Sequence, residues 1–370
     1  AASFKVGSFT LNTTTGNQAI TGVGFQPKAI ILWTMREFLF GGNQEYEYFI
    51  GAATGTANRW AMITSQNNYN DTAMSQSDIA NVLHIETSSV QGNKPVADFV
   101  SFDADGFTIN LSIAEAVSRT IFYTAIGGAD ISIQAGNFNS NTATGNQAVT
   151  GVGFQPKTVL FFFSPRNTTG VSLDTMHAMG IGLGLSSTNE RAAHYFGTDA
   201  VTSNEQSVQV TDKCIVSTNT SAAIDEAADF VSNDSDGFTI NWTTKSATAI
   251  KIGYLALGGT AQYAAGAFNQ PTTTGNQAVT GTGFTPVGEL FFSFSKASAT
   301  TPSANSNQML GGANSTTSRL VATLESQNGV DSDVEPEVLT STALCLVHTG
   351  TAGTTLAGAD FVSHDSDGLP

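Results

Sequence analysis

The chain has 370 residues, a formal net charge of −16 and a charged fraction of only 12%. This length accommodates two or three domains of ordinary size. The acidic charge would repel a phosphate backbone, which argues against nucleic acid as a partner. The most apolar runs, AIILW and TVLFFF, are far too short to cross a bilayer, so we expect no membrane insertion.

Two phrases recur along the chain and divide it into three tandem repeats. The first phrase, TGNQAITGVGFQPK and its near copies, begins at Thr15, Thr144 and Thr274. The second phrase, which opens ADFVS, begins at Ala97, Ala228 and Ala359. We therefore place the first, second and third repeats at residues 1–132, 133–262 and 263–370. Because almost no linker separates the repeats, we expect them to form a stiff rod or a compact row.

Within each repeat the pattern predicts strands and no helix. FKVGSFTL alternates apolar and polar residues, as a half-buried strand does. KAIILWTM, KTVLFFFS and GELFFSFS are continuous apolar runs, which predict central strands buried on both faces. ADFVSFDADGFTINLS is typical of a hairpin closed by an Asp-Gly turn. The expected fold is all-β, with one β-sandwich or jelly-roll-like module in each repeat.

The third repeat differs from the others at its end. After Asp367-Gly368 the sequence stops at Pro370, without a counterpart of the second repeat's closing hairpin FTINWTTKSATAIKIGYLALGG. Two interpretations stay open: the sequence is truncated, or another chain completes the open edge by adding a strand.

The closely spaced aspartates of the second phrase are the strongest candidates for a metal site. They form an Asp-x-Asp-Gly pattern at Asp103, Asp105, Asp234, Asp236, Asp365 and Asp367. Carboxylates at this spacing supply oxygen ligands to calcium in some loops. The favoured interpretation is turn chemistry, because Asp-Gly at a hairpin tip needs no metal and the distal Glu of a full calcium loop is absent.

Aromatic residues in the segments that differ between repeats are candidates for an interaction surface. They are Phe38, Tyr46, Tyr48, Trp60, Tyr69 and Tyr195, with Phe40 beside them. Such rings stack on sugars or pack against a protein partner. For several of them, a core position in a β-strand is the favoured interpretation.

Nothing in the sequence indicates catalysis or a cofactor. The five histidines fall at unrelated repeat positions, and no zinc, phosphate-loop or nucleophile motif is present. Cys214 and Cys345 occupy the repeat position where the first repeat has Leu83, which predicts a small buried apolar site and no disulfide. We therefore expect a protein that is not an enzyme.

The phrases at Gly16–Lys28, Asp103–Asn110 and Tyr123–Gly128, with their repeats, resemble modules of tailed-bacteriophage virion proteins. The resemblance implies β-sandwich modules in a decoration, fibre or tail-associated protein. It also implies a non-enzymatic structural role in a virion assembled in the host cytoplasm, with self-association and other virion proteins as partners.

The alternative hypothesis is a carbohydrate-binding or adhesive module at an extracellular surface. It predicts a glycan affinity that falls when an aromatic residue such as Trp60 is removed.

Overall fold

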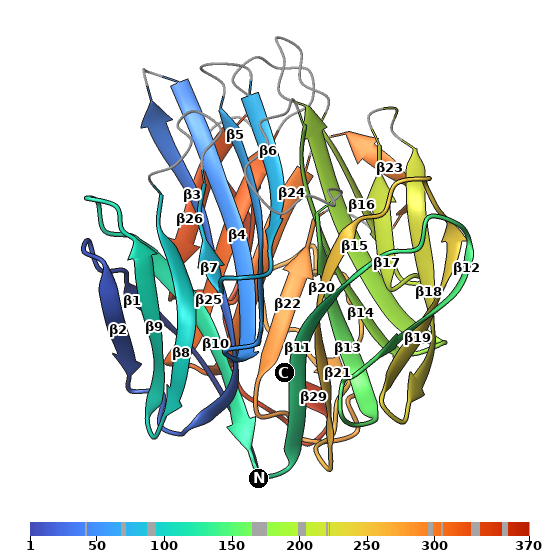
Figure 1. The fold of residues 1–370 in the computed structure, drawn as a ribbon, viewed down its shortest axis with the longest axis horizontal. Coiled ribbons are helices and arrows are strands. Elements are labelled where there is room, and N and C mark those ends of the chain that lie inside the picture. The colour runs from blue at the N-terminus through green and yellow to red at the C-terminus, as the bar shows by residue number, and fades with distance from the viewer. Residues whose placement is uncertain are drawn as a thin grey trace.

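The computed structural model confirms the all-β prediction (Figure 1). It describes residues 1–40, 43–67, 72–86, 94–164, 176–198, 205–219, 221, 223–294, 299–304, 306–326, 334–349 and 354–369. These residues form antiparallel sheets and contain no helix, so none of them belongs to a helix that could span a membrane.

The first repeat forms a six-stranded sheet in the order β1-β10-β3-β4-β5-β6 and a four-stranded sheet in the order β2-β9-β8-β7. The strands are β1 (Ala2–Thr10), β2 (Gly16–Thr21), β3 (Pro27–Phe40), β4 (Asn43–Gly55), β5 (Asn58–Asn67), β6 (Thr72–Asp78), β7 (Leu83–His84), β8 (Val96–Asp103), β9 (Gly106–Ile113) and β10 (Thr120–Gly128).

The second repeat has the same plan, with sheets in the orders β11-β20-β13-β14-β15-β16 and β12-β19-β18-β17. The strands are β11 (Ile131–Asn139), β12 (Gly145–Thr150), β13 (Pro156–Phe163), β14 (Met176–Ser186), β15 (Asn189–Thr198), β16 (Gln206–Val210), β17 (Ile215–Thr218), β18 (Ile224–Asp234), β19 (Gly237–Thr244) and β20 (Lys251–Gly259).

The third repeat is less complete in the part that the structure describes. β22, β24, β25 and β26 form a sheet, β21 pairs with β29, β27 pairs with β28, and β23 extends the larger sheet of the second repeat by pairing with β16. The strands are β21 (Val279–Thr280), β22 (Glu289–Ser293), β23 (Ala299–Ala304), β24 (Ser306–Ser315), β25 (Ser318–Ser326), β26 (Val334–Thr340), β27 (Cys345–Thr349), β28 (Thr354–Ala359) and β29 (Gly368–Leu369).

The two sheets of each complete repeat face each other across an apolar core, as in a β-sandwich. In the first repeat, Ile30 and Leu32 of β3 pack against Phe99 and Ile109 of the smaller sheet. The alternate residues of β3, including Ile31 and Trp33, point to the other face and belong to a second cluster. This confirms that β3 is buried on both faces. β13 follows the same plan, whereas every residue of β22 is partly exposed, so the same prediction was wrong for β22.

The cluster on the outer face of β3 joins all three repeats. Trp33, Phe162 and Leu310, one from each repeat, lie in the same group of buried residues. Strands of the third repeat, orange and red in Figure 1, lie against strands of both other repeats. β3 contacts β26, β6 contacts β14, and β16 pairs with β23. The larger sheets therefore enclose a common central core.

Three hydrogen bonds link the repeats in a closed cycle, and the two that involve Asn189 and Ser318 occupy equivalent positions. Thr54 Oγ1 of the first repeat accepts from Ala135 N of the second at 3.0 Å. Asn189 Nδ2 of the second donates to Ala265 O of the third at 3.1 Å. Ser318 Oγ of the third donates to Val6 O of the first at 2.7 Å. The repeats thus form a ring instead of the expected rod or row. Burial of the second apolar face of each larger sheet provides the physical reason.

Candidate functional sites

The two repeated phrases meet in space and hold each other. The carboxylate of Asp105 accepts hydrogen bonds from Gly22 N at 3.0 Å and from Gly24 N at 2.6 Å. Both glycines have positive φ, 83° and 89°, a conformation that turns their N–H groups toward one point and that other residues rarely adopt. The same pair of bonds recurs at Asp236 with Gly151 and Gly153, and at Asp367 with Gly281 and Gly283. We call this arrangement the Asp–Gly clamp.

The glycine that follows each clamp aspartate is required by close packing. A Cβ atom on Gly106 would lie 1.9 Å from the carbonyl oxygen of Ile20, and one on Gly237 would lie 1.9 Å from that of Val149. The hairpin was predicted correctly, but its two central residues are Ala104 and Asp105, and Gly106 opens the second strand. Gly106 is therefore needed for its close contact with β2 more than for the turn itself.

The remaining candidate metal ligands are also occupied as hydrogen-bond acceptors. Asp103 accepts from the hydroxyls of Ser101 and Thr108 at 2.8 and 2.7 Å. Asp234 accepts from Ser232 and Thr239, and Asp365 from Ser363. Across the described ranges, no three His, Cys, Asp or Glu side chains gather in a way that could hold a metal ion. The structure therefore gives all six aspartates a role in the hairpins.

We predict that Asp236→Ala lowers the free energy of unfolding by about 1–2 kcal/mol, because two backbone N–H groups lose a charged acceptor near the surface. Urea unfolding measures the change, with Asp212→Ala as a control that removes an exposed carboxylate outside the clamp. We expect calcium and a chelator to leave the unfolding midpoint of the unaltered chain unchanged. A rise of several degrees in calcium that disappears in Asp236→Ala would instead indicate a metal site.

Four of the six candidate interaction aromatics are fully buried within the chain. Tyr46, Tyr48, Trp60 and Tyr195 are each 0% exposed and belong to the central cluster. Trp60 lies between the first two repeats, with its Nε1 donating to Tyr254 O at 3.0 Å. These four rings cannot stack on a sugar in this conformation, because other repeats cover them. Tyr69 and the side chain of Phe38 lie outside the described part of the chain.

Two of these tyrosines meet a buried histidine where the repeats converge. Tyr46 Oη hydrogen-bonds to His177 Nδ1, and His177 Nε2 lies 2.8 Å from Glu205 Oε1, with all three side chains buried. The ring of Tyr195 lies 6.1 Å from His177 and 5.6 Å from Phe294 of the third repeat. The histidine thus joins the first and second repeats. Repeat position gave no signal for the contact with Tyr46, because Tyr46 lies in a different repeat from His177.

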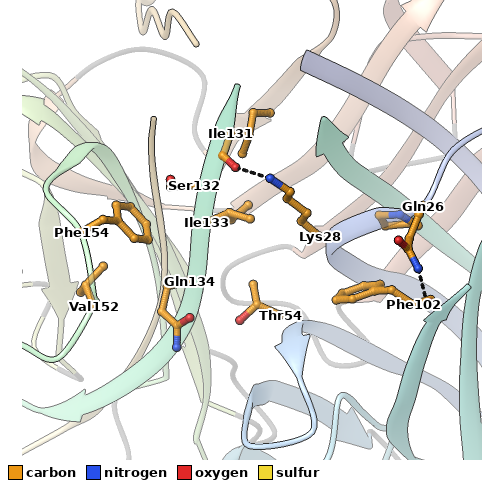
Figure 2. Close-up of a pocket in the computed structure, with 11 residues that line it drawn as sticks. Gln26, Lys28, Thr54, Phe102, Ile131, Ser132, Ile133, Gln134, Val152 and Phe154 are labelled. Atoms are coloured by element: carbon orange, nitrogen blue, oxygen red, sulfur yellow. Dashed lines mark hydrogen bonds between the residues drawn. The ribbon is translucent and has the colours of Figure 1, made fainter. Parts of the chain in front are cut away.

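A groove between the first and second repeats is shown in Figure 2 and has a volume of about 570 Å³. Lys28 of β3 reaches across it and donates to Ile131 O at 2.8 Å, and Gln26 donates to Phe102 O at 3.0 Å. Lys157 makes the equivalent bond to Ala261 O at the second joint. The groove residues include no carboxylate, histidine or cysteine. Its one charged side chain, Lys28, is engaged in the contact between the first two repeats.

A second hollow, of about 620 Å³, contains a rearranged ion pair. In the first and third repeats an arginine pairs with the aspartate of ADFVS, as Arg59 does with Asp98. The second repeat has Glu190 at that position, and Lys213 pairs with Asp229 at 2.9 Å instead. Burial raises the pKa of Glu190 to about 7, while Phe230 N donates to its carboxylate at 2.6 Å.

The two cysteines are free, as predicted. Cys214 is fully buried, like Leu83 at the same position of the first repeat, and burial raises the pKa of its thiol. Cys345 is partly exposed, with a pKa raised by burial to about 12. Neither thiol is therefore ionised enough to act as a nucleophile near neutral pH.

A carboxyl group stands in the third repeat at a position where the other two repeats have an apolar core side chain. Glu289 occupies the place of Ile30 and Val159, and its Oε2 lies 2.7 Å from His364 Nε2. Burial raises the pKa of Glu289 to about 8 and lowers that of His364. The folded state therefore keeps the Glu289 proton over a pH range in which the unfolded chain has lost it. This group's contribution to stability is present below about pH 4.5 and is lost as the pH rises through 8.

We predict that Glu289→Val stabilises the chain, and more so at pH 8 than at pH 5. At pH 8 the gain should be on the order of 1–3 kcal/mol, because a buried group that must ionise is replaced by an apolar one. Thermal unfolding at the two pH values measures the difference, and Glu289→Gln is the control that removes the charge and keeps the polar shape. An equal effect of Glu289→Val at both pH values would contradict this account.

Comparison with protein-family models and with curated proteins finds no match to this chain.

Proposed function

We propose that the protein is a non-enzymatic structural component of a phage-like virion, of the decoration, fibre or tail-associated type. The observation that carries the proposal is the structural role of the residues that the repeats share. The two phrases form the Asp–Gly clamp, and Lys28 and Lys157 fix the joints between repeats. The most regular part of the sequence is therefore devoted to building and connecting β-sandwich units.

The closed ring of repeats supports an assembly role. Closed cyclic arrangements are the usual form of homo-oligomers, and here one chain supplies three similar units around a common core. Such a ring suits a site of threefold symmetry on a shell or a fibre, and the segments that differ between repeats would distinguish its three sides. The net charge of −16 helps to keep a large assembly soluble and disfavours contact with packaged nucleic acid.

The experiment that tests the proposal follows the protein through particle purification. Virus-sized particles from a culture that produces the protein are separated on a density gradient and probed with an antibody against the chain. We expect the antibody signal in the particle band, and we expect it to remain there after protease treatment that removes loosely bound protein. Recovery only from soluble fractions or from the cell envelope would overturn the proposal.

A glycan array and light scattering provide independent checks. We expect the intact chain to bind no glycan, because the four described candidate aromatics are buried. We expect light scattering to find a self-associated species whose mass does not change when a chelator is added. Saturable binding to a glycan would favour the adhesive hypothesis instead.

A further inference from the structure

The larger sheets of the first two repeats have their edge strands covered inside the chain. β1 contacts β24 and β25, β11 contacts β4 and β5, and β6 contacts β14. β16 is extended by β23 of the third repeat through direct strand pairing. A strand edge that is left uncovered presents main-chain N–H and C=O groups with which another strand can pair. The closed ring of repeats removes this possibility for the larger sheets of the first two repeats.

The smaller sheets of the first two repeats have one covered edge and one uncovered edge. β7 contacts β4 and β5, and β17 contacts β14 and β15. β2 and β12 form the opposite edges, and in the part of the chain that the structure describes they pair only with β9 and β19, respectively. β2 lies at one margin of the molecule and β12 at the other (Figure 1).

The uncovered edge of β2 presents the main-chain groups of alternate residues. A Cβ atom on Gly106 would lie 1.9 Å from the carbonyl oxygen of Ile20, so the main-chain groups of Ile20 face β9. These groups alternate in direction along an antiparallel strand. The N–H and C=O groups of Asn17, Ala19 and Thr21 therefore face the uncovered edge.

The second repeat presents the same edge. The carbonyl oxygen of Val149 would lie 1.9 Å from a Cβ atom on Gly237, so the main-chain groups of Asn146, Ala148 and Thr150 face outward. The strands GNQAIT and GNQAVT contain no charged residue and no proline, and neither has a bulge. The usual features that prevent a strand edge from pairing with another chain are therefore missing.

We propose that β2 and β12 are interfaces between copies of this chain, which pair edge to edge as antiparallel strands. A pair centred on Ala19 places this residue opposite the partner's Ala19, and Asn17 opposite the partner's Thr21. All three side chains are exposed on the outer face of the sheet. The register thus brings together small and hydrogen-bonding side chains without like charges, and both copies contribute the same residues, as a twofold contact requires.

The charge of the chain favours a neutral strand edge as the contact between copies. Each copy carries a net charge of −16, so contact through acidic surfaces would be repulsive. A pair of six-residue strands is smaller than a standard interface, which buries about 1,600 Å² in total, so we expect weak and reversible association. Two such edges let one chain join two others. Added salt should strengthen the association, because it screens the repulsion between copies.

Sedimentation velocity over a range of protein concentrations tests the interface. We expect the average mass of the unaltered chain to rise from 38.4 kDa to beyond that of a dimer. Ala148→Pro removes an outward N–H group from β12 and should limit association to dimers. Adding Ala19→Pro should leave a monomer. Proline is tolerated on an edge strand where its nitrogen faces outward, and the thermal unfolding midpoint checks that each variant folds. Ala19→Ser keeps the N–H group and should associate as the unaltered chain does.

A charge swap shows whether two β2 edges meet each other. In the Ala148→Pro background, Ala19→Lys and Ala19→Asp should each weaken the dimer at least about threefold, because like charges would face each other. Mixing these two variants should restore the dimer, because opposite charges would then face each other. A chain that stays monomeric at all concentrations, association that survives both prolines, or no gain on mixing would each overturn the inference.

The inference deepens the self-association expected of the proposed virion role, and its biological meaning rests on that role. The two are tested separately, because sedimentation follows contact between copies and the density gradient follows location. Protein in the particle band with no self-association in solution would overturn the interface and leave the virion role standing. Self-association through β2 and β12 without protein in the particle band would do the reverse.

Discussion

Replacing Trp60 by alanine is expected to lower the free energy of unfolding by about 3–5 kcal/mol. The side chain is fully buried between the first and second repeats, and its ring centroid lies 5.0 Å from that of Phe162. Its Nε1 donates to Tyr254 O, which would lose its partner. Gly253 faces the ring so closely that a Cβ atom there would lie 2.6 Å from it. The surroundings are therefore shaped around the indole and would collapse poorly onto a smaller side chain.

Denaturant unfolding measures this loss, with two controls. Trp60→Phe keeps an aromatic ring and removes the hydrogen bond. It should therefore lower the free energy of unfolding clearly less than Trp60→Ala does. Val117→Ala truncates a side chain that is 56% exposed and should change stability by less than about 0.5 kcal/mol. If Trp60→Ala left stability unchanged but removed binding to a glycan, the adhesive hypothesis would replace the structural one.

Gly237→Ala should destabilise the second repeat by about 3 kcal/mol, at the upper end of the usual cost of overpacking. The added Cβ atom would lie 1.9 Å from the carbonyl oxygen of Val149, and backbone on both sides would have to move. That movement would separate Asp236 from Gly151 and Gly153 and so open the clamp.

Hydrogen exchange at the amides of Gly151 and Gly153 reports the opening of the clamp directly. We expect both amides to exchange faster in Gly237→Ala than in the unaltered chain, together with the loss of stability. Gly266→Ala adds the same methyl group where nothing lies within 4 Å, and it should be nearly neutral. Equal effects of the two substitutions would show that close contact between the phrases is not what requires the glycine.

Local patterns determined the strand content and its spacing. The alternation in ADFVSFDADGFTINLS predicts β8 and β9 because side chains of a strand alternate between two faces, and the structure has both strands. The continuous apolar run at Lys28–Met35 likewise predicts a strand buried on both sides. For β22 the same reasoning failed, because burial also depends on a neighbouring strand that the described part of the third repeat does not provide.

The sequence by itself determined an all-β chain with repeated units and the places where glycine and aspartate are needed. The tertiary structure decided what those residues do. Asp105 binds Gly24 across 81 residues, and the third repeat contacts the first to close the ring. The tertiary structure also decided that Trp60 and Tyr195 are core residues instead of surface rings. The physical reason is that periodicity records which face of a strand is apolar, whereas the element that covers this face comes from a distant part of the chain.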